Sequence, residues 1–254
     1  MGAGARPPEK RSPKTHSRKM NYFYHPLLDT SVNQFSFTPE ESRHIVKVLR
    51  KKAGDQLHIT NGKGYLFVAE ILEANPERCM GKLLETRKFH PKMYSLHVAV
   101  APTKKTDRFE WFLEKATEIG IDRITPVICQ RSERRKLPME RMQRVVQEAM
   151  KQSLRTYLPE LEEPVALREF LEREQPVLKF IAHCEEDEKM DLKRRVAADK
   201  DVIILIGPEG DFTHDEIQMA CEKGFIPVSL GEYRLRTETA ALVACTTVNL
   251  INNG

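Results

Sequence analysis

The second half of the chain alternates short apolar runs with segments whose apolar residues recur every three or four positions. This alternation begins near Ser95 and is typical of an α/β domain in which strands and helices take turns. The predicted strands span 96–100, 124–128, 178–182, 201–206 and 225–230. The predicted helices span 107–119, 138–156, 187–198, 214–222 and 238–250. The pattern therefore predicts a doubly wound domain with a parallel sheet.

The region from 21 to about 90 has a different pattern. Short, partly alternating apolar segments at 56–60, 65–72 and 80–84 predict strands, and Asn61-Gly62 predicts a turn between the first two. One helix is expected over 39–50, with Thr38 as its N-cap and a buried stripe of Ile45, Val48 and Leu49. Short strands with a single helix suggest a small β-barrel.

Two glycine-containing turns near the end of the chain each follow an apolar strand and precede a helix. The first reads GPEGDFTHDEI from Gly207, and the second reads LGEYRLRTETA from Leu230. In the first, Thr213 and Glu216 predict a capping box. In the second, Thr237 or Thr239 can cap the last helix. Because open α/β sheets bind ligands at the carboxyl ends of their strands, these turns are where we expect the chemistry.

These two motifs resemble the signature of the ribosomal RNA small subunit methyltransferase E family. Residues 35–64, 115–120 and 148–155 are also similar to that family, so the likeness covers roughly 20–252. The resemblance implies a C-terminal SPOUT-type parallel-sheet domain with a trefoil knot over 91–254. It also implies a PUA-like β-barrel RNA-binding domain over 20–90. One departure is Asp211, where the family more often has a second glycine; Asp tolerates left-handed backbone angles better than most residues.

The same resemblance implies an activity, a cofactor and partners. It points to S-adenosylmethionine-dependent methylation of N3 of a specific uridine in 16S ribosomal RNA. The expected substrate is the RNA of the small subunit within an assembled 30S particle. It also implies a homodimer and no metal. Neither a GxGxxG nor a GxxxxGK[ST] motif is present, so a dinucleotide site and a phosphate loop are unsupported.

Composition and charge narrow the picture. The five cysteines are scattered without a CxxC pair, which indicates neither a zinc site nor a disulfide framework and favours a reducing cytoplasm. No apolar run is long enough to span a membrane. Residues 1–20 hold six Lys and Arg against one acidic residue, so the remaining chain is close to neutral and nucleic acid must be bound by local patches. Residues 1–19 are expected to be a disordered basic tail, with Met20 as the natural start and the rest a cloning remnant or upstream misreading; a functional basic arm is the alternative.

The cofactor pocket is expected to be built from backbone groups and apolar side chains of both turns. The residues expected to bind the cofactor are His183, Gly207, Pro208, Glu209, Gly210, Leu230, Gly231 and Leu235. For His183, an ordinary place at the end of a strand is an equally good interpretation.

Methylation of uridine N3 requires loss of a weakly acidic proton, which leaves negative charge on O2 and O4. A fixed cation beside these oxygens would stabilise that charge, and Arg236, with Arg234 next to it, is the expected source. Either arginine could instead pair with Glu232, Glu238 or a partner chain. Glu209 and Glu238 are candidate general bases, although orienting a small ionised fraction of substrate would also suffice.

RNA contacts are expected from cations on both domains. The candidates are His44, Arg50, Lys104, Arg108, Arg131, Arg144, Gln152 and Arg155. Clusters of this kind are often only solvated surface. Two other functions remain open: a non-catalytic RNA-binding or ribosome-assembly protein, and a SPOUT methyltransferase that acts on a different RNA.

Overall fold

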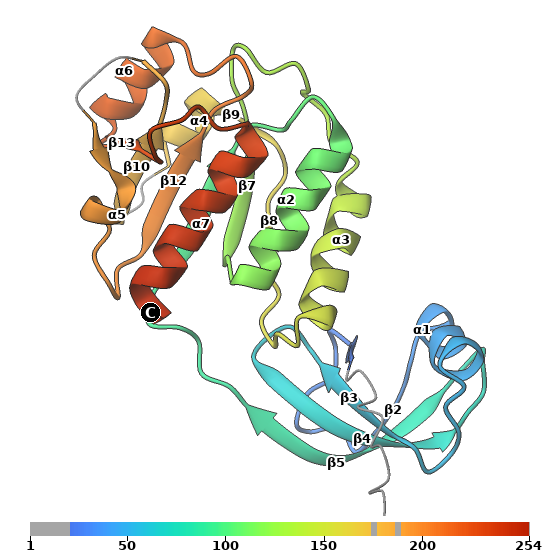
Figure 1. Cartoon of the computed structure of the whole chain (residues 1–254). Helices are drawn as coiled ribbons and strands as arrows, with labels where there is room; N and C mark the ends of the chain where they lie inside the picture. Colours follow the sequence, from blue (N-terminus) through green and yellow to red (C-terminus); the bar gives the residue numbers. More distant parts are fainter. Residues whose placement is uncertain (1–20, 174–176, 186–188, 254) are drawn as a thin grey trace, which may run out of the picture.

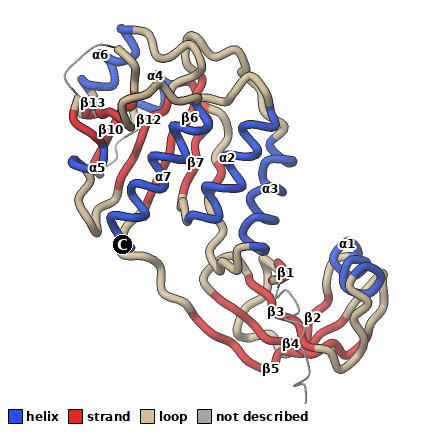
Figure 2. Tube along the Cα trace, viewed as in Figure 1, coloured by secondary structure: helices blue, strands red, loops and turns tan. Residues whose placement is uncertain are grey.

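The computed structural model describes residues 21–173, 177–185 and 189–253. Within them the chain forms a small antiparallel-rich sheet followed by a larger parallel sheet covered with helices (Figures 1 and 2). The predicted tail over 1–19 lies outside the described residues.

The N-terminal sheet has the strand order β1-β3-β4-β5-β2. Its strands are β1 (Tyr22–Tyr24), β2 (Gln34–Ser36), β3 (Gln56–Thr60), β4 (Tyr65–Glu73) and β5 (Met80–Lys88). Register shifts in the β4–β5 pair allow this sheet to curl, and its concave side buries aromatic and aliphatic side chains such as Phe35, Phe67 and Ile59. The strand predicted over 80–84 is confirmed as β5, which extends four residues further, to Lys88. Strands β1 and β2 were not predicted.

The predicted helix over 39–50 is only partly correct. Thr38 caps it as expected, but α1 (Pro39–Arg43) passes into a π-helix (His44–Val48). The Leu49 amide donates to the His44 carbonyl, five residues back, which rotates the following side chains away from their α-helical positions. Ile45 is buried as predicted, whereas Val48 and Leu49 are 66% and 39% exposed, so two residues of the predicted buried stripe were wrong.

The C-terminal sheet is parallel throughout, in the order β11-β13-β10-β12-β6-β7-β8, with β9 paired to β7. Its strands are β6 (Leu96–Val100), β7 (Arg123–Ile128), β8 (Glu160–Leu161), β9 (Val165–Ala166), β10 (Leu178–Ala182), β11 (Met190–Asp191), β12 (Val202–Ile206) and β13 (Ile226–Ser229). The five predicted strands are confirmed, with boundaries within two residues. The two-residue strands β8, β9 and β11 were not predicted.

Each face of this sheet has its own hydrophobic core, because successive residues of a strand point to opposite faces. Along β12, Val202, Ile204 and Ile206 face one core, and Ile203 and Leu205 face the other. Figure 1 shows α2, α3 and α7 over the first face. The helices are α2 (Thr106–Ile119), α3 (Met139–Gln152), α4 (Leu167–Leu171), α5 (Leu192–Arg195), α6 (His214–Glu222) and α7 (Thr237–Asn253). Helices α4 and α6 cover the second face.

The polar helix predicted over 187–198 was wrong. The described part of that segment forms β11 and the four-residue α5, and Leu192 of α5 and Val196, which follows it, are buried in the first core. Its many charges point outward, so they gave no periodicity from which the short strand could be detected. The trefoil knot implied by the resemblance stays a prediction.

The two sheets meet at a joint formed by the β3–β4 turn and the segment that follows α3. The Gly64 amide donates to the Thr156 carbonyl at 2.9 Å, and the Leu158 amide donates to the Gly62 carbonyl at 2.9 Å. Both glycines have positive φ, and the Tyr157 hydroxyl, which donates to Phe89 O, occupies the space where a Gly64 side chain would be. Beside this joint, Lys151 of α3 pairs with Glu41 of α1 at 3.1 Å.

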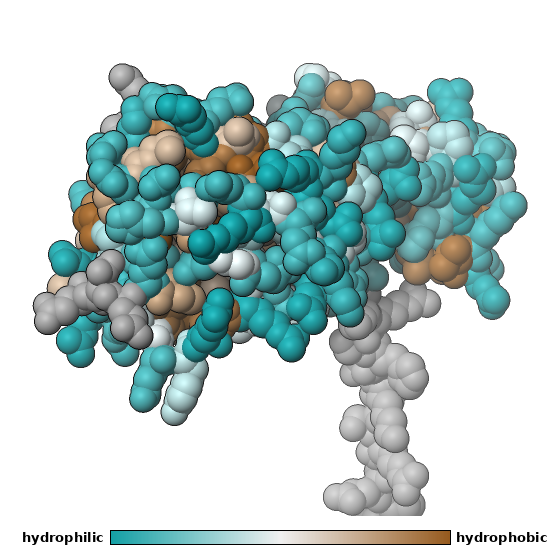
Figure 3. Space-filling model, turned by 90° about the horizontal axis from the view of Figure 1, so that it is seen from above, coloured by the Kyte–Doolittle hydropathy of each residue, from teal (hydrophilic) through white to brown (hydrophobic). Residues whose placement is uncertain are grey.

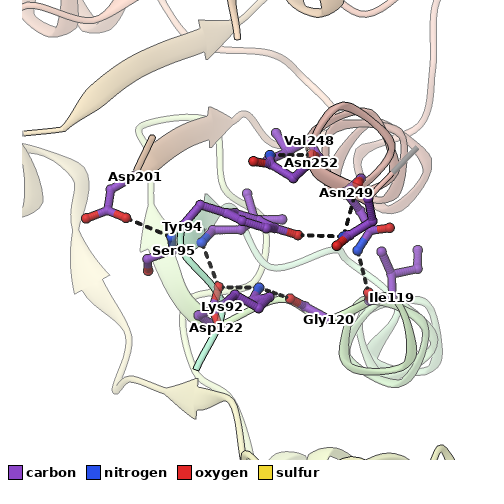
Figure 4. Close-up of polar contacts among 12 residues, drawn as sticks. Lys92, Tyr94, Ser95, Ile119, Gly120, Asp122, Asp201, Val248, Asn249 and Asn252 are labelled. Carbon is purple, nitrogen blue, oxygen red and sulfur yellow. Dashed lines mark hydrogen bonds and ion pairs between the residues drawn. The ribbon is translucent and has the colours of Figure 1, made fainter. Parts of the chain in front are cut away.

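The segment between the sheets is held at the amino ends of the parallel strands (Figure 4). Lys92 Nζ donates to the Gly120 carbonyl at 2.6 Å and pairs with Asp122 at 2.7 Å, and the Ser95 amide donates to Asp201 at 2.7 Å. These contacts fix where β6 begins. They lie at the opposite end of the sheet from the two signature turns, so they serve stability rather than chemistry.

Candidate active site at the carboxyl edge of the parallel sheet

The loops that follow β10, β12 and β13 enclose two adjoining pockets of about 280 and 400 Å³. Both pockets share Ala182, Cys184, Arg234, Leu235 and Ala240. The smaller pocket is completed by Ile206, Gly207, Pro208, Glu209, Asp211, Arg236 and Thr237. The larger is completed by His183, Lys189, Val228, Ser229, Leu230, Gly231, Glu232 and Tyr233. Figure 3 looks down on this end of the molecule and shows a largely hydrophilic surface with small hydrophobic patches.

The pockets bring together most residues expected to bind a cofactor. His183, Gly207, Pro208, Glu209, Leu230, Gly231 and Leu235 all line one pocket or the other. Gly210 lines neither of them among the described residues, and a Cβ added there would lie 3.4 Å from Arg131 rather than in the pocket. Ala182, Ile206, Thr237 and Ala240 were missed, although their places at strand ends and at the start of α7 were a usable signal.

The first signature turn is fixed by bonds within it and by bonds from two other segments. Thr237 Oγ1 donates to the Gly207 carbonyl at 3.1 Å, and a Cβ on Gly207 would lie 3.0 Å from the Phe212 ring. Asp211 adopts a left-handed φ of 63°, and its carboxylate accepts from the amides of Cys184 at 2.7 Å and Phe212 at 2.8 Å. Asp thus fits a conformation that usually favours glycine, and its side chain links this turn to the end of β10.

The helix after this turn begins as the sequence predicts. Thr213 and Glu216 form a capping box, and Phe212 and Ile217 are both buried in the same core. The second oxygen of the buried Glu216 carboxylate accepts from the Gln130 amide at 2.7 Å, which attaches α6 to the loop after β7. The capping box therefore has a second use that local sequence does not reveal.

The second signature turn presents two unpaired cations to the smaller pocket. Arg234 and Arg236 are exposed, and their guanidinium groups form no ion pair or hydrogen bond with residues of the described ranges. Glu238, one of their possible partners, is instead buried and lies 3.7 Å from Arg108 Nε. Both guanidinium groups are therefore available to a ligand.

Cys184 is the one thiol on the walls of both pockets within the described chain. Partial burial raises the pKa of this thiol, the Asp211 carboxylate raises it further, and Arg234 opposes the effect. The thiol is therefore protonated near neutral pH and is suited to lining a pocket rather than to nucleophilic attack.

The residues expected to bind RNA differ in their surroundings. His44, Arg144 and Gln152 come from different domains yet line one cleft of about 520 Å³ between α1 and α3. Five of the candidates have their cationic groups engaged by the protein: Arg155 donates to Glu118 O, Arg131 to Gly210 O and Phe212 O, Lys104 pairs with Glu133, Arg108 with Glu238, and Arg144 of the cleft with Glu140. Arg50 is exposed at the end of the π-helix with a φ of 54°.

Neither the requirements of a metal site nor those of a membrane-spanning helix are met by the described residues. Among the described residues, no group of three or more His, Cys, Asp or Glu side chains could hold a metal ion. None of the described helices combines the length and the apolarity needed to cross a membrane.

Known proteins resemble this chain over nearly its whole length. Residues 90–249 match the model of an RNA methyltransferase domain, and residues 37–84 match that of an RNA methyltransferase PUA domain. Ribosomal RNA small subunit methyltransferase E of Rickettsia conorii is 32% identical over 213 residues, which is 83% of this chain and 87% of that protein.

Two solved structures share the fold. A probable rRNA-methyltransferase from Porphyromonas gingivalis is 37% identical with a TM-score of 0.85, covering 92% of this chain and 98% of that one. A ribosomal RNA small subunit methyltransferase E from Neisseria gonorrhoeae, bound to S-adenosyl methionine, is 27% identical with a TM-score of 0.81 and the same coverage.

Proposed function

The chain belongs to the ribosomal RNA small subunit methyltransferase E family, and we propose that it methylates N3 of one uridine in 16S ribosomal RNA. The coarser activity, S-adenosylmethionine-dependent methylation of ribosomal RNA, follows from the family and from the cofactor bound by the Neisseria relative. The observation that carries the finer proposal is the pair of unpaired arginines beside the pocket.

The residues present suit S-adenosylmethionine. Apolar side chains of Leu230, Leu235 and Ala240, together with backbone groups of both turns, form walls appropriate for an adenine ring and a flexible amino-acid tail. The two pockets adjoin and share a wall, so one elongated molecule could occupy both. When bound, S-adenosylmethionine supplies a methyl group on a sulfonium sulfur.

The role proposed for Arg236 is to assist the substrate rather than to bind the cofactor. As N3 of uridine gains a methyl group it loses its proton, and the negative charge that forms lies largely on O2 and O4. A guanidinium fixed near these oxygens stabilises that charge without having to reorganise. Arg236 is free to do so because Glu238, its nearest acidic neighbour along the chain, is paired with Arg108.

The cleft between α1 and α3 is the proposed RNA-binding surface. His44 and Gln152 can donate to phosphates or bases there, next to Tyr22 and Tyr24, and Arg144 can do so by exchanging its exposed ion pair with Glu140 for a phosphate. Lys151 contributes less, because Glu41 and Glu148 already neutralise it. We further propose that the substrate is an assembled 30S particle and that the enzyme acts as a homodimer; light scattering of the purified protein tests the second point.

Methyl transfer to small ribosomal subunits lacking this modification tests the proposed function. Labelled S-adenosylmethionine is supplied, and the nucleosides of the product RNA are separated by mass spectrometry. We expect the label in N3-methyluridine. Label in another nucleoside would refute the atom or base, and cofactor binding without any label would indicate a different RNA substrate. Failure to bind S-adenosylmethionine would favour a non-catalytic role.

A further inference from the structure

Three loops at the carboxyl edge of the sheet are connected through the peptide groups of Lys104. This residue follows β6, which lies between β12 and β7 in the sheet. The Lys104 amide donates to Glu209 Oε1 of the first signature turn at 2.9 Å. The Lys104 carbonyl accepts from Arg134 of the loop after β7, at 3.0 Å from Nε and 2.7 Å from Nη2. Lys104 is therefore held on both sides by charged groups from neighbouring loops.

A second connection joins the same two outer loops directly. Arg131 Nη1 donates to the Gly210 carbonyl at 2.9 Å and to the Phe212 carbonyl at 3.2 Å. The aliphatic part of Arg131 also lies against Gly210, at the distance where an added Cβ would touch it. The turn that forms one wall of the smaller pocket is thus held by a residue that lines neither pocket.

We propose that Glu209 and Arg134 are positioning residues that hold this wall of the cofactor pocket through Lys104. The inference rests on the proposed function only in taking the pocket to be the cofactor site. A charge-assisted bond to a backbone amide orients the Glu209 side chain, and the two-pronged contact of Arg134 fixes the same segment from the other side. The backbone at Pro208 and Glu209 is then in place before a ligand arrives.

This positioning role differs from the two roles that the sequence suggests for these loops, which are a general base at Glu209 and RNA contacts from the cations after β7. A general base must accept a proton, whereas a positioning residue needs only to accept the hydrogen bond from Lys104. A glutamine can accept that bond and cannot act as a base. Likewise, Arg134 directs two of its five N–H donors to the Lys104 carbonyl and is thereby held against that loop, so we expect Arg134 to matter more for the cofactor than for RNA.

The test compares Glu209→Gln, Glu209→Ala and Arg134→Ala, with Lys136→Ala as a control in the loop of Arg134. Cofactor affinity is measured by calorimetry, turnover is followed across pH, and amide hydrogen exchange of Lys104 is recorded without ligand. We expect Glu209→Ala and Arg134→Ala to weaken cofactor binding about tenfold and to speed exchange of the Lys104 amide. Glu209→Gln should recover most of the affinity and turnover that Glu209→Ala loses, with the parent's pH profile, and Lys136→Ala should leave cofactor affinity within about twofold.

Two results would overturn the proposal. Glu209→Gln could lose turnover as completely as Glu209→Ala while Lys104 exchange stays slow, which would assign chemistry to the carboxylate. Alternatively, Arg134→Ala could weaken RNA binding and leave cofactor affinity intact. Because the exchange measurement needs neither cofactor nor RNA, it reports on the connection even if the proposed function fails.

Discussion

Replacing Gly64 by alanine tests whether the joint between the two sheets depends on the contact between the β3–β4 turn and Tyr157. Gly64 has a φ of +86°, and a Cβ there would overlap the hydroxyl and ring of Tyr157. Gly54 has a φ of +88° but no atom within 4 Å of the added Cβ, so Gly54→Ala is a matched control in the same domain.

The two substitutions share one cost and differ in a second. A positive φ destabilises alanine relative to glycine by about 1 kcal/mol in both variants. At Gly64 the Tyr157 ring must also move, which adds roughly 1–3 kcal/mol of overpacking, together with about 1 kcal/mol if its bond to the Phe89 carbonyl is lost. Because Tyr157 is 37% exposed, it can partly relax into solvent, so we expect a total of about 2–4 kcal/mol.

Urea denaturation of both variants gives their free energies of unfolding. Gly64→Ala should be less stable than Gly54→Ala by at least about 1 kcal/mol, and the difference should largely disappear when Tyr157 is also replaced by alanine. Equal destabilisation by the two glycine substitutions, or a difference that persists without Tyr157, would refute the account of the joint. Gly64→Ala should also weaken RNA binding more than cofactor binding, since the cleft lies between the domains and the pockets do not.

The remaining predictions concern the pocket. Arg236→Ala should lower turnover by about two to three orders of magnitude and leave cofactor affinity within about twofold, as for loss of a group that acts in the transition state; normal turnover would remove Arg236 from the mechanism. In calorimetry, Gly207→Ala should weaken cofactor binding more than Gly210→Ala. A Cβ at position 207 would lie 3.0 Å from the packed Phe212 ring, whereas a Cβ at position 210 would lie 3.4 Å from the flexible Arg131 side chain. The reverse order of affinities would contradict the described turn. Alkylation of Cys184 should be slow at pH 7, because the pKa of its thiol is raised, and should become faster as the pH rises and the thiolate forms; S-adenosylmethionine should slow it. The buried Cys129, whose thiol pKa is raised by burial, should stay unmodified until the protein unfolds. Mass spectrometry of the alkylated peptides tests both expectations.

The parallel sheet was predictable because helices cover both of its faces. Strands buried on both sides become continuous apolar runs, and Val202–Ile206 is such a run with every residue buried. The capping box at Thr213 was equally predictable from the sequence, since it depends on two residues three positions apart. These features are local, so the sequence contains the information needed to place them.

The errors arose where the structure departs from local periodicity. A switch to i→i+5 bonding at His44 exposed Val48, which an α-helix would have buried. The charged segment around Leu192 buries too few apolar residues to reveal a two-residue strand and one helical turn. In both cases contacts with the rest of the domain determined the backbone, and the residues themselves would have tolerated another conformation.

Arginines show most clearly why a charge pattern does not identify an RNA site. Arg155, Arg131 and Arg134 bind carbonyl groups 37, 79 and 30 positions away, so no local window could reveal that these cations are engaged. Arg234 and Arg236, in contrast, have no such partner among the described residues, and they lie at the pocket. Cations that brace loops and cations that await a ligand look alike in a sequence and differ in a structure. If the proposed function holds, the arginines that bind loop carbonyls keep the pocket loops ordered before RNA arrives. The free energy of RNA binding can then orient the uridine toward Arg236 instead of ordering these loops.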